Sequence, residues 1–154
     1  PDMSNYFLQP IGSTDSEAAF CYLAEYLKNT YRQKPSETEI FEAIQKVTKE
    51  LAQHGTFNFI LSNGEWMIAH CSTNLHYLMR KAPFGKAHRI DDDGVIDFSD
   101  YAKEGDKVNI ITTFPLTKDE TWTKMENGDL FFLKMEIKLL KSSVHPKQQL
   151  MMAH

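Results

Sequence analysis

The feature that most constrains the fold is a change in the spacing of apolar residues at Gly55. Before this glycine, apolar side chains recur every three or four residues, as on one face of an α-helix. After it, the apolar runs are short, rich in β-branched and aromatic residues, and bounded by turn residues, which is typical of β-strands. The order predicts an α+β fold in which two helices precede a mostly antiparallel sheet.

Two helices are predicted before Gly55. The first should run over residues 15–30, and the second should begin after Ser36, which forms a capping box with Glu39. Gly55 is expected to be the C-terminal cap of the second helix. The apolar face of the first helix is expected to hold Phe20, Leu23, Ala24 and Leu27. The face of the second is expected to hold Ile40, Phe41, Ile44, Val47 and Leu51.

Five or six strands are predicted after Gly55, with the sequence Asn63-Gly64 as a hairpin turn between the first two. The segment 107–114 should be central, because it is rich in valine, isoleucine and threonine. Residues 57–61 and 109–111 show little alternation, which indicates burial on both faces. The predicted strands cover residues 56–61, 65–71, 75–80, 87–90, 107–114 and 130–140.

Composition excludes several classes of protein. The net charge of −4 and the pI near 5.9 give no basic surface for nucleic acid. No apolar run approaches the length of about 18 residues that a membrane span needs, and no signal peptide is visible. Two distant cysteines form no disulfide framework, which favours a cytoplasmic protein.

Acidic residues and histidines are the candidate metal ligands of this sequence. Asp91, Asp92 and Asp93, with Asp97, lack the spacing of a calcium loop and predict a solvated turn. The six histidines show no zinc-binding spacing. No metal site and no cofactor are therefore expected.

The two cysteines are candidates for a nucleophile. Cys21 falls within the first predicted helix and Cys71 at the end of a predicted strand, and neither has a positioned base near it in the sequence. Buried thiols are the expectation for both. No catalytic residue is therefore assigned within this chain.

The segment from Thr14 to Glu17 opens the first helix with the spacing of a second capping box. It places Asp15 in the first helical turn, where free amides and the helix dipole favour a negative charge. Asp15 has two interpretations: it stabilises the start of the helix, or it receives the ammonium group of an amino acid. Spacing alone favours the first.

Two later segments change that balance. The first is Cys71-Ser72-Thr73-Asn74-Leu75-His76-Tyr77 with Arg80-Lys81-Ala82-Pro83-Phe84-Gly85; the second is Thr113-Phe114-Pro115-Leu116-Thr117 with Glu120-Thr121-Trp122 and Asn127-Gly128-Asp129. Together with the Thr14–Glu17 segment, and in this order, they resemble the C-terminal part of the small stand-alone class II glutamine amidotransferases of the YafJ type. The resemblance extends over about residues 6–139.

The resemblance implies a four-layer αββα sandwich of the N-terminal-nucleophile hydrolases, of which this chain would form about half. It implies hydrolysis of the glutamine side-chain amide by an N-terminal cysteine through a γ-glutamyl thioester. Asp15 would hold the α-amino group of glutamine, with Thr14 beside it. Residues 1–140 would form the C-terminal part of the amidotransferase domain, and residues 141–154 a loose tail.

The chain also departs from the family pattern. In the family, a cysteine at the N-terminus, an arginine loop and an oxyanion-binding Asn-Gly pair precede the Thr14–Glu17 segment, whereas this sequence begins with Pro1. The expected partners are therefore the missing N-terminal half of the fold and glutamine or another γ-glutamyl compound. The alternatives are a hydrolase of a different γ-glutamyl amide and a non-catalytic binding module. The sequence leaves a homo-oligomer open.

Overall fold

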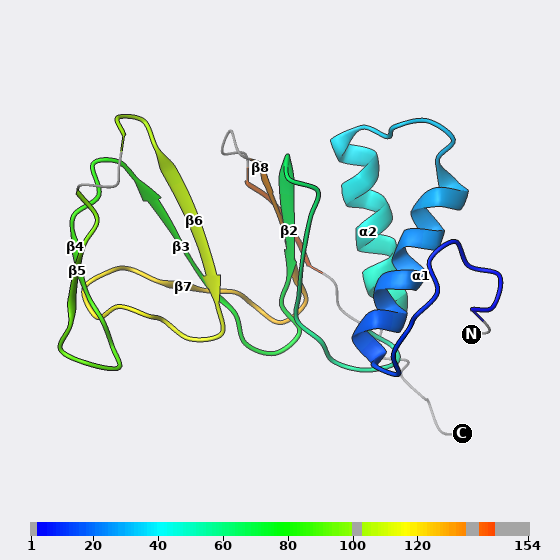
Figure 1. Cartoon of the computed structure of the whole chain (residues 1–154), viewed down its shortest axis with the longest axis horizontal. Helices are drawn as coiled ribbons and strands as arrows, with labels where there is room; N and C mark the ends of the chain where they lie inside the picture. Colours follow the sequence, from blue (N-terminus) through cyan, green and yellow to red (C-terminus); the bar gives the residue numbers. More distant parts are fainter. Residues whose placement is uncertain (1–2, 100–102, 135–138, 144–154) are drawn as a thin grey trace, which may run out of the picture. The chain divides into compact units, whose positions relative to one another are not determined.

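The computed structural model describes residues 3–99, 103–134 and 139–143. The chain divides into two compact units, a helical one that extends to Phe57 and a β-rich one over Asn58–Ser143 (Figure 1). The elements are two α-helices followed by antiparallel strands, so the predicted α+β class is confirmed.

The first helix, α1 (Asp15–Thr30), has the predicted bounds. Its buried side chains are Cys21 and Leu23, whereas Phe20 is 49% exposed. The prediction that Phe20 faces the core was therefore wrong. Spacing alone did not tell which neighbouring apolar residue, Phe20 or Cys21, would be buried.

The second helix, α2 (Glu37–Leu51), begins with the predicted capping box between Ser36 and Glu39. Its apolar face is confirmed, because Ile44 and Val47 are almost fully buried. The predicted C-terminal cap was wrong. The helix ends at Leu51 with Ala52 as its cap, and backbone bonds from residues 53 and 54 to Glu50 and Leu51 tighten the last turn.

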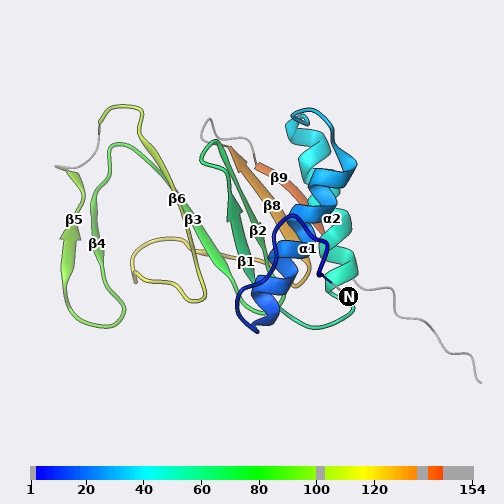
Figure 2. The same cartoon turned by 45° about the vertical axis from the view of Figure 1, so that its right-hand side comes forward.

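A four-stranded antiparallel sheet has the order β1-β2-β8-β9 (Figure 2). Its strands are β1 (Phe59–Ser62), β2 (Trp66–His70), β8 (Asp129–Lys134) and β9 (Leu139–Ser143). Gly64 has a φ of 89° and lies in the turn that joins β1 to β2, so the predicted hairpin is confirmed. The single strand predicted over 130–140 is two strands that pair with each other.

Two smaller sheets complete the β-rich unit. The order β6-β3-β7 unites β3 (His76–Lys81), β6 (Lys107–Thr112) and β7 (Thr123–Lys124), and β4 (Lys86–His88) pairs with β5 (Val95–Asp97). The prediction of a single sheet was therefore wrong, as was the central position of β6, which among the described strands pairs with β3 alone. β5 and β7 were missed because they are only three and two residues long.

The core of the β-rich unit lies where the four-stranded and three-stranded sheets meet. It contains Cys71, Leu75, Met125 and Phe131, with Tyr77 and Ile111 packed against them. The rings of Tyr77 and Phe131 lie 5.1 Å apart in an edge-to-face arrangement. These contacts join a residue of β3 to a residue of β8, so they fix the two sheets to each other.

Continuous burial occurs in a different strand from the one predicted. All of β8 from Asp129 to Leu133 is buried, whereas Ile60 in β1 is 53% exposed and that strand alternates. β1 is an edge strand, so its outer residues have fewer neighbours than those of β8. Ile110 and Ile111 of β6 are half-buried.

The predicted tail falls partly on described residues. Residues 141–143 belong to β9, and residues 144–154 lie outside the described part of the chain. The boundary of the amidotransferase domain near residue 140 stays a prediction. Neither described helix has the length and apolar character that crossing a membrane requires.

Candidate functional site

The start of α1 is held by the side chains of Thr14 and Glu17. The Thr14 hydroxyl accepts from the Glu17 amide at 3.3 Å, as predicted. The Glu17 carboxylate does not return to Thr14; it accepts from the amides of Ile11 and Gly12 at 2.8 and 2.9 Å. The preceding loop folds back so closely that a Cβ on Gly12 would lie 2.8 Å from a Glu17 carboxylate oxygen. Glu17 therefore ties the loop to the helix.

Asp15 lies in the first turn of α1, as predicted, and its side chain is exposed. One carboxylate oxygen accepts from the amide of Ser16 at 2.8 Å. Among the described residues, no group donates to the other oxygen. The carboxylate is thus oriented by its own helix and remains accessible to a ligand.

Asp15 lines two neighbouring hollows of the helical unit. The smaller, of about 100 Å³, lies between the start of α1 and residues 54–57. The larger, of about 400 Å³, is lined by Asp15, Tyr22, Glu50 and His54 together with apolar side chains. No lysine or arginine lines either hollow within the described residues. Hollows that present carboxylates and whose described lining includes no lysine or arginine suit a positively charged group.

Glu50 and Tyr22 interact within the larger hollow. The Tyr22 hydroxyl donates to the Glu50 carboxylate at 2.8 Å, and this hydrogen bond, with burial, raises the pKa of Tyr22. Sequence reasoning did not single out Glu50, Tyr22 or His54. Glu50 and His54 lie at the end of α2, far along the chain from Asp15, and no local pattern joins them to it.

The β-rich unit contains a second cluster, built from the two later segments of the family resemblance. Arg80 on β3 forms a two-pronged ion pair with Glu120, through Nε at 2.6 Å and Nη2 at 2.5 Å. Glu120 also accepts from the Thr117 hydroxyl, which in turn accepts from the Trp122 indole at 2.9 Å. Burial opposes ionisation of Glu120, but the bonds from Arg80 and Thr117 outweigh it and hold its pKa below the ordinary value.

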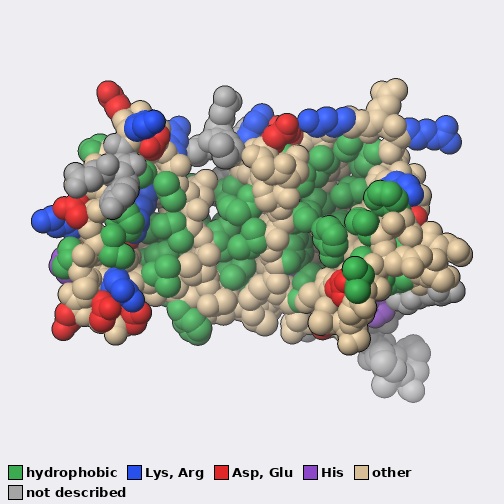
Figure 3. Space-filling view, viewed as in Figure 1, with side chains coloured by type: hydrophobic (Ala, Val, Ile, Leu, Met, Phe, Trp, Pro, Cys, Tyr) green, Lys and Arg blue, Asp and Glu red, His purple; other side chains and the backbone are tan. Residues whose placement is uncertain are grey.

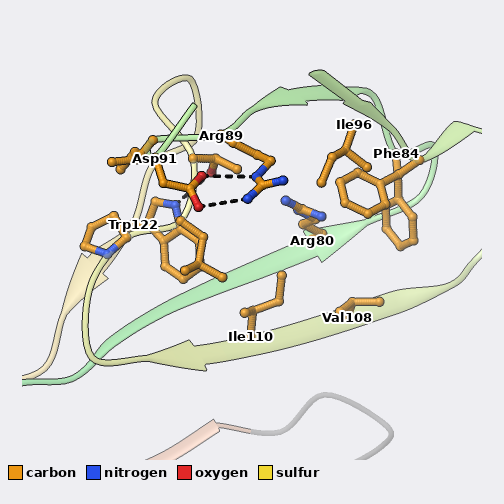
Figure 4. A pocket seen from close by; sticks show the side chains of 13 residues that line it. Arg80, Phe84, Arg89, Asp91, Ile96, Val108, Ile110 and Trp122 are labelled. Carbon is orange, nitrogen blue, oxygen red and sulfur yellow. Dashed lines mark hydrogen bonds and ion pairs between the residues drawn. The ribbon is translucent and has the colours of Figure 1, made fainter. Parts of the chain in front are cut away.

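A pocket of about 480 Å³ opens beside this cluster (Figure 4). Its floor is the outer face of β3 and β6, where Arg80, Val108 and Ile110 lie, and its walls include Phe84, Ile96 and Trp122. Apolar side chains are visible at the surface over these two strands (Figure 3). Trp122, which belongs to the second of the two later segments, lines this pocket.

The structure gives Ser72-Thr73-Asn74 a structural role, which the sequence did not reveal. The Asn58 side-chain oxygen accepts from the amides of Ser72 and Thr73 at 2.8 and 3.1 Å. The Asn74 side chain donates to the Thr113 carbonyl oxygen, and His76 Nδ1 lies 3.1 Å from that same oxygen. The tripeptide therefore stabilises the connection between β2 and β3.

The aspartates of residues 91–97 pair with cations. Asp91 and Asp92 contact Arg89, Asp93 contacts Lys118, and Asp97 contacts Lys86. In the described ranges, no cluster of three or more His, Cys, Asp or Glu is placed to hold a metal ion.

Both cysteines are buried, as predicted. Cys71 is fully buried and Cys21 is 3% exposed. Burial raises the pKa of the Cys71 thiol, which disfavours the reactive thiolate. His70 is buried on β2, and His76 lies on β3 in another sheet.

Comparison with known proteins gives the class of this chain. The family model of the class II glutamine amidotransferases matches residues 1–154. The chain belongs to that family.

Individual relatives agree with this assignment. A Haemophilus influenzae protein named "Putative glutamine amidotransferase" is 81% identical over 96% of this chain and 50% of its own length. The Escherichia coli "Putative glutamine amidotransferase YafJ" is 45% identical over 79% of this chain and 48% of its own length. A Pseudomonas aeruginosa crystal structure, called a "predicted glutamine amidotransferase", superposes with a TM-score of 0.77 at 33% identity, over 89% of this chain and 54% of that one. The chain thus spans about half the length of these relatives.

Proposed function

We propose that this chain holds the α-amino group of glutamine in a glutaminase reaction, through Asp15 with Thr14 fixing the start of the helix. A cysteine thiol outside these residues attacks the side-chain amide carbon, ammonia leaves, and water hydrolyses the γ-glutamyl thioester to glutamate. Cys21 and Cys71 do not fit the role of nucleophile, because both are buried.

The observation that carries the proposal is the environment of Asp15. The carboxylate stands at a helix start, keeps one oxygen without a donor among the described residues, and lines hollows that contain Glu50 but neither lysine nor arginine. A substrate ammonium would gain a charge-assisted hydrogen bond there. Correct placement of the ammonium also places the scissile amide, and a misplacement of about 1 Å would cost roughly 10²-fold in rate.

The sharpest test removes the two partners of this contact separately. In the intact enzyme, hydrolysis of glutamine is compared with hydrolysis of glutaramate, the analogue that lacks the α-amino group. The wild type should prefer glutamine by at least about tenfold in kcat/KM, the value of one charge-assisted contact. Asp15→Asn should raise KM for glutamine sharply and abolish most of this preference, with little effect on glutaramate.

Asp93→Asn is the matched control, because it removes the same charge from an exposed carboxylate of the β-rich unit. It should leave the preference unchanged. If Asp15→Asn lowers the rates with both substrates equally, Asp15 acts on the fold rather than on the amine. Unchanged kcat and KM would remove Asp15 from the site.

Asp15 would recognise a group that glutamine shares with every γ-glutamyl amide. The same assay with γ-glutamyl alkylamides therefore separates a glutaminase from a hydrolase of another γ-glutamyl compound. A non-catalytic module would hydrolyse none of them, which would contradict the proposal.

A further inference from the structure

The pocket beside β3 and β6 has no part in the proposal for glutamine. It is a hollow of about 480 Å³, within the range of small-molecule sites. Six of its lining residues come from the two later segments of the family resemblance: Arg80, Phe84, Pro115, Leu116, Thr117 and Trp122. The two later segments of the family resemblance therefore line a pocket that the proposed reaction at Asp15 does not use.

The walls of this pocket are mainly apolar and partly open to solvent. Leu116 is 53% exposed, and Ile96 and Val108 are each 39% exposed. A ligand with an apolar body would remove this surface from water, and such burial is favourable in proportion to its area. The aromatic rings of Phe84 and Trp122 suit a flat or branched group.

Two guanidinium groups point into the pocket and toward one another (Figure 4). Arg80 gives Nε and Nη2 to Glu120, and among the described residues no acceptor binds its Nη1. Arg89 is bound to Asp91 and Asp92, but these side chains are 43%, 69% and 50% exposed. Exposed ion pairs contribute little, so an incoming acceptor can share Arg89 with them.

We propose that this pocket binds an organic carboxylate with an apolar or aromatic body. The carboxylate accepts from Nη1 of Arg80 and from Arg89, and the body packs against Ile96, Val108 and Trp122. The charged lining residues are Arg80, Arg89 and Asp91, and Glu120 and Asp92 pair with the two arginines from beside the pocket. A cationic ligand would put its charge beside two guanidiniums, and a wholly apolar one would leave Nη1 of Arg80 without an acceptor from the described residues.

The test compares three probes with one apolar body: 4-phenylbutanoate, 4-phenylbutan-1-ol and 4-phenylbutylamine. Binding to the intact protein is followed by isothermal titration calorimetry. The acid should bind saturably and at least about tenfold more tightly than the alcohol, with the amine weakest.

Two variants distinguish the contribution of the Arg89 charge to binding from the contribution of the cavity. Arg89→Gln should weaken the binding of the acid and leave the alcohol unchanged, so that the preference for the acid narrows to the part that Arg80 supplies. Val108→Phe should weaken all three probes about tenfold or more by filling the pocket. Val95→Phe is the matched control, because Val95 is a similarly exposed valine that does not line the pocket; it should change affinity less than about twofold.

Two results would overturn the proposal. Equal affinities for acid and alcohol would remove the role of the two arginines, and the absence of saturable binding by the acid would remove the site. The binding assay does not depend on Asp15 or on glutamine hydrolysis, so this proposal and the proposed function fail separately.

Discussion

The start of α1 and the Arg80 cluster are built in opposite ways. At the start of α1, the side-chain hydrogen bonds of Thr14, Asp15 and Glu17 within the described part of the chain join residues at most six apart, and Asp15 stays exposed. In the cluster, Arg80 and Glu120 lie 40 residues apart, and their side chains are only 13% and 19% exposed. The first arrangement leaves a charged side chain exposed to solvent, whereas the second uses its charges to join distant segments.

This difference predicts that Arg80 matters far more for stability than its neighbour Arg89. Arg80→Met leaves the partly buried Glu120 without its cation and should lower the free energy of unfolding by about 3 kcal/mol. Urea denaturation followed by circular dichroism measures the loss. Arg89→Met removes exposed pairs only and should leave the urea midpoint unchanged within error.

A double variant tests the cause of that loss. In Arg80→Met combined with Glu120→Leu, no unpaired charge remains, and a large part of the lost stability should return. If the double variant is as unstable as the sum of the two single ones, packing rather than charge explains the effect. If Arg80→Met and Arg89→Met lower the free energy of unfolding equally, the predicted difference between the two arginines is wrong.

The contacts at the start of α1 should have a smaller effect, confined to their own loop. Glu17→Ala removes the acceptor of the Ile11 and Gly12 amides and should cost about 1 kcal/mol, as for a lost helix cap. Hydrogen exchange should speed up at these two amides and not in β3. Glu17→Gln keeps one acceptor oxygen and should have a weaker effect. Faster exchange across the β-rich unit would contradict a local role.

The same contrast explains what the sequence could predict. The caps at Thr14 and Ser36 are local patterns, and both helix starts were found from them. The hairpin at Gly64 and the burial of Cys71 were likewise predicted. The family resemblance pointed to Asp15, whose contact with a substrate stays a prediction.

What could not be predicted depends on pairing between distant residues. The partition into three sheets is set by which strands meet, and a period of two in the sequence does not encode the partner. β7 has two residues, too few for any pattern. Arg80 and Glu120 both belong to the segments that carry the family resemblance, but nothing in the sequence showed that they pair. The same holds for Glu50, which joins Asp15 only through the packing of two helices.

The pH dependence of stability offers the finest test of the cluster. The pKa of Glu120 lies below its ordinary value, because the bonds from Arg80 and Thr117 outweigh burial. Such a carboxylate contributes stability that is present above the unfolded pKa, about 4.3, and is lost as the pH falls through the lower folded value. The gap in unfolding free energy between the wild type and Glu120→Gln should therefore be constant from pH 7 to about 5 and narrow below about 4.

Urea denaturation at pH 7, 5, 4 and 3 measures this gap. Asp93→Asn, which alters an exposed ion pair with Lys118, serves as the control. The difference in unfolding free energy between the wild type and this variant should stay close to zero at all four pH values. A gap for Glu120→Gln that widens on acidification would require a folded-state pKa above the unfolded one. Burial would then dominate over the ion pair, and the cluster would resemble a desolvated acid rather than a charge held by Arg80.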